Sequence, residues 1–200
     1  MKLETRIKQI LVALIGNCIL GAGVAMGSQA LLGTDPSVSF SQAAAPLVGV
    51  TIGQMITITN ITLLIITFFI KKKNIGLATL IVVLLNQYPV DFVTNLITHS
   101  DSLIINILWV LAGIVFVAIG CDILIASNLG MGIYDAFVFG VADKLNKKFV
   151  FVRYGIDSIF LILTIVLKGY IGIGTILPYL LTGPTIAYTK PIVEKMIKFD

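Results

Sequence analysis

The most restrictive feature of this sequence is a series of apolar runs, each about as long as a bilayer is thick. The run from Ile10 to Leu32 contains no charged residue, and the run from Ile107 to Leu129 contains only Asp122. A helix of about 20 apolar residues spans the hydrocarbon core of a membrane. Because 58% of the 200 residues are hydrophobic, 12% are charged and the mean hydropathy is +1.03, one water-soluble core could not bury this apolar surface. The sequence therefore predicts an all-α, polytopic membrane protein.

The apolar runs predict six transmembrane helices in a single integral membrane domain that covers residues 1–200. Two shorter stretches are predicted to lie outside the spans. Residues 33–49 are expected to form a loop with a short interfacial helix, and residues 133–146 an amphipathic helix at the membrane surface. The six predicted spans are Ile10–Leu32, about Val50–Ile70, Ile75 to about Ile97, Ile107–Leu129, about Phe149–Leu167 and Ile171 to about Val193.

The basic residues support this helix count and indicate an orientation. With six spans and a cytoplasmic amino terminus, all of the 14 Lys and Arg residues except Lys168 lie on one side. Short loops that carry Lys and Arg are retained in the cytoplasm. We therefore predict that both termini and the segments 71–73 and 144–148 are cytoplasmic, and that residues 34–45 and His99 are outside. The basic residues are scattered over several loops, which argues against a nucleic-acid partner.

The two halves of the chain resemble each other at a nearly constant spacing, which indicates an internal repeat. Repeat one covers about residues 7–98 and repeat two about residues 102–195, with three predicted spans each. Because three is an odd number, the second repeat enters the membrane from the opposite face, and the repeats are predicted to be inverted. Glycines at matched positions predict close packing of the first and fourth spans. The alignment pairs Gly16 with Gly113, Gly23 with Gly120, Leu32 with Leu129, Gly33 with Gly130 and residues 75–80 with 171–176.

Inverted repeats suggest a function, because many secondary transporters are built from them. Two equivalent half-structures can exchange conformations and open a midplane site to each side in turn. The sequence thus favours a small transporter, or the membrane-embedded substrate-binding subunit of one. The alternative is a non-transporting membrane protein that acts through protein partners. The expected partners are the lipid bilayer, a small-molecule or ion substrate, and a second copy of the chain or another membrane protein.

Candidate substrate-binding residues lie where apolar runs are interrupted. One run ends at two spaced glycines and is followed by a tyrosine and a carboxylate, and two predicted spans contain polar breaks with a proline, at residues 86–89 and 182–184. Broken helices at inverted positions are typical of a midplane binding site. We predict one polar cavity between these segments, although two ordinary proline kinks and a hydrated interfacial cap at Asp135 fit the same residues. The candidate residues are Asn86, Gln87, Tyr88, Tyr134, Asp135 and Thr182.

Two carboxylates within the predicted spans are candidates for a proton or cation site. Asp122 lies about two turns before the cytoplasmic end of its span, and Asp157 about two turns into the next one. Ionisable groups in hydrocarbon are costly and usually face a cavity or a partner. Arg153 is one turn from Asp157 and could be its counter-ion. The alternative is that both carboxylates are hydrated near the interface or paired with Arg153.

Other site classes find no support in the sequence. His99 has no neighbouring Cys or Glu, and Cys18 and Cys121 lie alone in apolar runs, so we predict neither a metal site nor a disulfide. No phosphate-binding glycine loop is present, and no set of nucleophile and base is recognisable. We therefore expect a protein that is not an enzyme and that uses no cofactor.

The segment Asn128-Leu129-Gly130-Met131-Gly132-Ile133-Tyr134-Asp135, together with Gly172-Ile173-Gly174-Thr175, resembles the bacterial YczE/YyaS/YitT group of small multi-pass membrane proteins. That group often shows Leu-Gly-x-Gly-Pro-Trp-Asp at the first segment. The resemblance implies a protein of the bacterial plasma membrane and carries over no catalytic residue. This chain keeps Leu129, Gly130, Gly132 and Asp135, and has Ile133 and Tyr134 in the places of Pro and Trp.

Overall fold

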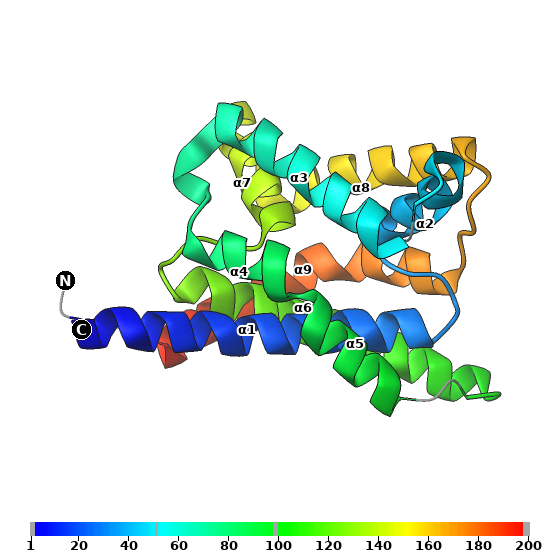
Figure 1. Cartoon of the computed structure of the whole chain (residues 1–200), viewed down its shortest axis with the longest axis horizontal. Coiled ribbons are helices and arrows are strands. Elements are labelled where there is room, and N and C mark those ends of the chain that lie inside the picture. Colours follow the sequence, from blue (N-terminus) through cyan, green and yellow to red (C-terminus); the bar gives the residue numbers. More distant parts are fainter. Residues whose placement is uncertain (1–2, 51, 98–99, 198–200) are drawn as a thin grey trace.

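The computed structural model describes residues 3–50, 52–97 and 100–197, and these ranges contain helices and no strand. His99, predicted for an outer loop, lies outside them. Figure 1 shows the arrangement. The helices are α1 Leu3–Gln29, α2 Pro36–Val48, α3 Ile52–Lys71, α4 Leu77–Leu85, α5 Gln87–Leu96, α6 Leu103–Ala126, α7 Ile133–Leu145, α8 Phe149–Val166 and α9 Ile173–Met196, with a 3-10 turn η1 at Lys72–Asn74.

Four of the described helices are long and apolar enough to cross a membrane: α1, the α3 segment, α6 and α8. A fifth span results if α4 and α5, which meet at a 44° bend, are counted together. The sixth predicted span corresponds to α9, which has 24 residues but contains three prolines. Its prolines, threonines and tyrosines dilute its apolar residues, so α9 is not among the candidate spans. The chain is thus a multi-pass, all-helical membrane protein with four or five such spans.

The first and fourth predicted spans end three residues earlier than the apolar pattern predicts, at Gln29 in α1 and at Ala126 in α6. The reason is the same at both ends. Leu31 and Asn128 have positive φ angles of 51° and 58°, and each is followed two residues later by a glycine with positive φ. A left-handed backbone cannot continue a right-handed helix, and it favours glycine because a Cβ atom would clash. The short helices α2 and α7 begin directly after these turns.

Helices α1 and α6 lie side by side along the long axis of the molecule, as Figure 1 shows, and pack through their glycines. A Cβ atom built on Gly23 would lie 2.6 Å from the backbone nitrogen of Val117, and one built on Gly120 would lie 2.6 Å from the nitrogen of Leu20. Such distances leave room only for hydrogen atoms. The predicted close packing of these two helices through Gly16, Gly23, Gly113 and Gly120 is therefore confirmed.

The two halves of the chain also contact each other through the short helices α2 and α7. Helix α2 of the first half lies on α8 of the second, and α7 of the second half lies on α3 of the first. The loops before these helices make matching contacts. The Leu32 carbonyl accepts a hydrogen bond from the Gly174 N–H at 2.8 Å, and the Leu129 carbonyl accepts one from the Ala78 N–H at 2.9 Å. Each loop is thus anchored on the first turn of a helix in the other half.

The α1–α6 crossing leads to a prediction about stability. Gly120→Leu should lower the melting temperature in detergent by several degrees, because a side chain at this crossing must push the backbones apart, at a cost of about 1–3 kcal/mol or more. Gly155→Leu on α8 is the matched control, since a Cβ atom there meets nothing within 4 Å. Equal melting temperatures for the two variants would contradict the close crossing.

Candidate functional site

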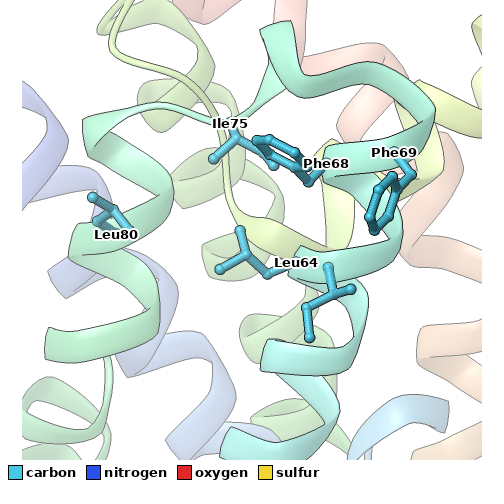
Figure 2. A pocket seen from close by; sticks show the side chains of 6 residues that line it. Leu64, Phe68, Phe69, Ile75 and Leu80 are labelled. Carbon is cyan, nitrogen blue, oxygen red and sulfur yellow. The ribbon is translucent and has the colours of Figure 1, made fainter.

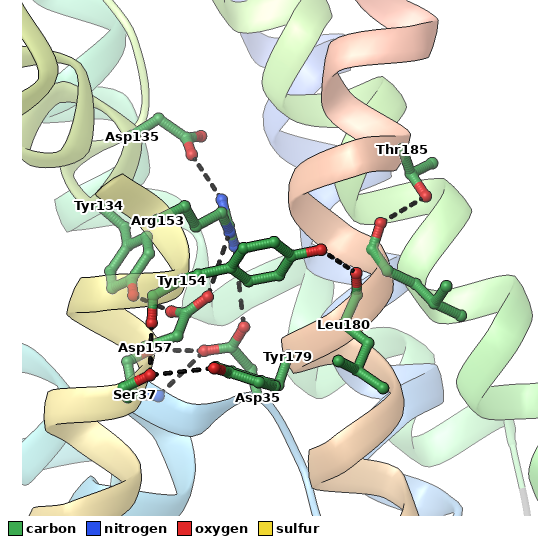
Figure 3. Close-up of polar contacts among 12 residues, drawn as sticks. Asp35, Ser37, Tyr134, Asp135, Arg153, Tyr154, Asp157, Tyr179, Leu180 and Thr185 are labelled. Carbon is green, nitrogen blue, oxygen red and sulfur yellow. Dashed lines mark hydrogen bonds and ion pairs between the residues drawn. The ribbon is translucent and has the colours of Figure 1, made fainter. Parts of the chain in front are cut away.

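A buried arginine holds the most highly charged group of side chains in the described structure. Arg153 of α8 is 3% exposed. Its Nη1 atom lies 3.0 Å from Oδ1 of Asp135, its Nε atom 3.5 Å from Oδ2 of Asp157, and its Nη2 atom 3.9 Å from Oδ2 of Asp35. Figure 3 shows these carboxylates arranged around the guanidinium. We refer to Asp35, Tyr134, Asp135, Arg153 and Asp157 as the Arg153 cluster.

Three separate elements supply the carboxylates. Asp157 follows Arg153 by one turn of α8, so the two side chains share a helix face. Asp135 lies in the first turn of α7. Asp35 caps the amino terminus of α2, where its Oδ1 atom accepts a hydrogen bond from the Ser37 N–H at 3.0 Å. The positive end of each helix dipole stabilises the carboxylate beside it. Two helix amino termini, one from each half of the chain, therefore deliver carboxylates to one guanidinium.

Tyr134 completes the cluster with a phenol and an aromatic face. Its hydroxyl donates a hydrogen bond to Oδ1 of Asp157. The guanidinium carbon of Arg153 lies 5.1 Å from the centre of its ring, within the range of a cation–π contact. Burial and the neighbouring charge of Asp157 raise the pKa of Tyr134 well above its usual value. The phenol is therefore protonated and acts as a hydrogen-bond donor.

The charges of the cluster do not balance within it. Three carboxylates surround one guanidinium, and the side chains of Asp135 and Asp157 are 4% and 1% exposed. A buried charge without a counter-charge is costly. A group that carries positive charge, a proton or a cation, is therefore favoured at this place. The side chain of Asp35 is 30% exposed, which makes it the accessible edge of the cluster.

The cluster lies beside the middle of α9, at one of the predicted helix breaks. A Cβ atom built on Gly183 would lie 3.3 Å from Cδ of Arg153. One turn away, the Tyr154 hydroxyl donates a hydrogen bond to the Leu180 carbonyl at 2.8 Å, and Tyr154 packs against Tyr179 (Figure 3). Thr182, a candidate binding residue, is 2% exposed and lies at the same level of the helix. Arg153 thus lies against both Asp135 and the 182–184 segment.

The other predicted break lies against a different helix. Asn86 occupies the bend between α4 and α5, and its Oδ1 atom would be 3.2 Å from a Cβ atom on Gly21 of α1. Tyr88 is 62% exposed, and Gln87 begins α5. No hydrogen bond or ion pair joins these residues to the Arg153 cluster within the described ranges. The proline-containing bend therefore packs on α1 in this structure.

The two candidate ion-site carboxylates have different partners. Asp157 pairs with Arg153 and Tyr134, as described above. Asp122 of α6 is fully buried, and its Oδ2 atom accepts a hydrogen bond from the Thr189 hydroxyl of α9 at 2.5 Å. Its other oxygen has no hydrogen-bond partner among the described residues. The interpretation of Asp135 as a hydrated interfacial cap is wrong, because the structure buries this residue and pairs it with Arg153.

The sequence matches the model of a family of unknown function, DUF6198, over residues 7–191. The chain belongs to this family. It is 28% identical over 184 residues to the uncharacterized protein YyaS of Bacillus subtilis (strain 168), covering 90% of this chain and 92% of the relative. It is 25% identical over 181 residues to the uncharacterized membrane protein YczE of the same organism, covering 88% and 82% of the two chains. No solved structure matches. The resemblance expected from the glycine motifs is confirmed.

One member of the cluster in this DUF6198 chain, Asp35, is not predicted by the sequence pattern. Asp35 appeared only as part of a polar loop, whereas it reaches Arg153 across the boundary between the halves. The internal repeat contains a sign of this role. Asp35 follows Gly33 by two residues. Gly33 aligns with Gly130, and Tyr134 and Asp135 come shortly after Gly130. The repeat thus predicts that both loops turn back in the same way, and this could have drawn attention to the carboxylate after the first turn.

The charge balance of the cluster predicts an unusual pattern of stability. Arg153→Met should lower the free energy of unfolding by about 3–5 kcal/mol, because it leaves buried carboxylates without their counter-charge. Adding Asp135→Asn to this variant should recover part of the loss, since one of the uncompensated charges is removed. Arg6→Met, at an exposed position, serves as the control and should leave stability nearly unchanged. Thermal melting in detergent measures all three. A fully stable Arg153→Met variant would contradict the ion cluster.

Proposed function

We propose that this chain is a small transporter, or the membrane-embedded substrate-binding subunit of one, and that its substrate passes the Arg153 cluster. The observation that carries the proposal is the burial of Arg153 and its carboxylates beside the middle of a long helix. Ionisable residues in the interior of membrane helix bundles mark pathways for substrates, ions and protons. A cluster that served packing alone would not need three carboxylates around one cation.

The packing of the two halves supports an inverted-repeat mechanism. The contacts of α2 with α8 and of α7 with α3 are related by exchange of the halves, as are the hydrogen bonds of Leu32 and Leu129. Two halves with equivalent folds can exchange conformations, which is the basis of alternating access. Because Asp35 comes from the first half and Arg153 from the second, such an exchange would break and re-form an ion pair across the boundary.

The carboxylate excess suggests how transport is driven. In this proposal Asp157 and its neighbours take up a proton or a cation together with the substrate. The proton or cation is released after the protein changes to the opposite conformation. Asp122, which lies near the end of α6 and is bonded to Thr189, provides a separate ion-binding step. Asn86, Gln87 and Tyr88 would line the path only in another conformation, because in this one Asn86 lies against α1 and the other two side chains are exposed.

The proposed location is the bacterial plasma membrane, with six spans and both termini in the cytoplasm. In Figure 1, α1 begins and α9 ends at the same end of the molecule, and the α8–α9 connection lies at the opposite end. This arrangement supports counting α9 as a span. A second copy of the chain or another membrane protein would join this transporting unit as a partner.

Cysteine labelling tests the six-span topology at its critical helix. In a chain in which Cys18 and Cys121 are changed to Ser, single cysteines would be introduced as Lys147→Cys, Lys168→Cys and Lys195→Cys, all at exposed positions. A membrane-impermeant thiol reagent applied outside intact cells should label only the second variant. Labelling of both the Lys168 and Lys195 variants from one face would mean that α9 does not cross the membrane.

Uptake into proteoliposomes tests transport itself. Vesicles loaded with a pH-sensitive dye would be exposed to a panel of amino acids, sugars, amines and carboxylic acids, with and without an imposed proton gradient. Uptake of at least one compound should fall by about tenfold or more in Asp157→Asn, because a coupling carboxylate is lost. Asp91→Asn, which removes an exposed carboxylate from α5, is the matched control and should retain uptake. Equal signals from wild type, Asp157→Asn and empty vesicles would favour the non-transporting alternative.

A further inference from the structure

An open apolar groove lies between α3 and α4, at the end of the molecule where η1 connects them (Figure 2). Its volume is about 430 Å³. Every residue that lines it is aliphatic or aromatic, and Phe69 and Phe68 are 81% and 57% exposed. The lining residues are Leu64, Ile65, Phe68, Phe69, Ile75 and Leu80.

The groove exists because its two walls pack against different partners. Helix α3 lies on α7, whereas α4 lies mainly on α1, so the facing sides of α3 and α4 diverge below η1. The turn that joins them is held in place. Nδ2 of Asn74 donates a hydrogen bond to the Ala136 carbonyl at 3.2 Å, and the Ala78 N–H binds the Leu129 carbonyl. These hydrogen bonds fix the connection between the two walls of the groove.

Positive charge is concentrated in the connection between α3 and α4, at the η1 end of the groove. Lys71, Lys72 and Lys73 lie between the lining residues Phe69 and Ile75. Lys71 forms an ion pair with Asp143 of α7. Lys72 and Lys73 are exposed, and no ion pair involves them within the described ranges. The connection at one end of the apolar groove thus carries two exposed lysines for which the described residues supply no counter-charge.

We propose that this groove binds an anionic phospholipid, with an acyl chain along α3 and α4 and the phosphate on Lys72 and Lys73. Charge complementarity selects this occupant. Basic groups next to membrane helices attract anionic headgroups, and basic pockets between helices bind lipids of this class. One lipid molecule would fill the groove with its acyl chain and pair its phosphate with the two lysines. The proposal is independent of transport.

Native mass spectrometry of the full chain, released from nanodiscs of equal parts phosphatidylglycerol and phosphatidylcholine, tests the headgroup contact. The wild type should retain phosphatidylglycerol preferentially. The double variant Lys72→Gln/Lys73→Gln should lower that preference by about 25-fold. Each lysine near an anionic headgroup contributes a factor of roughly five, and the two factors multiply. Lys147→Gln/Lys148→Gln removes two exposed charges outside the groove and should keep the preference. An equal loss in both double variants would show that diffuse surface charge alone attracts the lipid, and would overturn the proposal.

A second variant tests the groove with the lysines intact. Ile65→Trp would place a bulky ring in the groove and should reduce the amount of retained lipid. Ile162→Trp on α8, where the wild-type residue is 59% exposed, is the control for adding a tryptophan to the apolar surface and should not. Unchanged lipid retention in Ile65→Trp, or a lipid-free dimer in which a second copy covers α3 and α4, would refute lipid binding in the groove.

Discussion

The ion pairing of the buried Arg153 is the interaction on which the arrangement of the short helices α2 and α7 depends. A guanidinium in an apolar bundle requires counter-charges with good geometry, and it finds them on α8 itself, on α7 and on the loop before α2. Those three carboxylates cannot meet unless α2 lies on α8 and α7 begins beside Arg153. The ion cluster therefore specifies how the short helices pack, in addition to any part it has in function.

The close crossing of α1 and α6 is the second constraint, and it has a different physical origin. In lipid, burying apolar surface gives little advantage to helix association, so close packing of small residues has to stabilise the contact. Glycines at the crossing allow the backbones to touch, and left-handed turns at Gly33 and Gly130 then redirect the chain into α2 and α7. Glycine thus acts through its small size at the helix crossing and through its backbone freedom at the turns.

Helix α7 connects the two parts of the molecule for which we propose ligands. Its first turn carries Tyr134 and Asp135 of the Arg153 cluster, and its last turn carries Asp143, the partner of Lys71 at the end of the apolar groove. A shift of α7 would therefore change both places.

The sequence by itself determined the all-helical membrane class, the long helices and their approximate ends, the family and the glycine contact between α1 and α6. These features are local or repeated: hydropathy over about 20 residues specifies a span, and glycine at matched positions specifies a close contact. It also identified Tyr134, Asp135, Asp157 and Arg153 as polar residues of interest. Only the tertiary structure decided that Asp135 is buried, that Asp35 joins the cluster, that Asp122 and Asp157 have separate partners and that the Asn86 bend packs on α1. Those outcomes depend on which side chains meet across helices far apart in the sequence, and neither hydropathy nor spacing encodes the rotation of one helix against another.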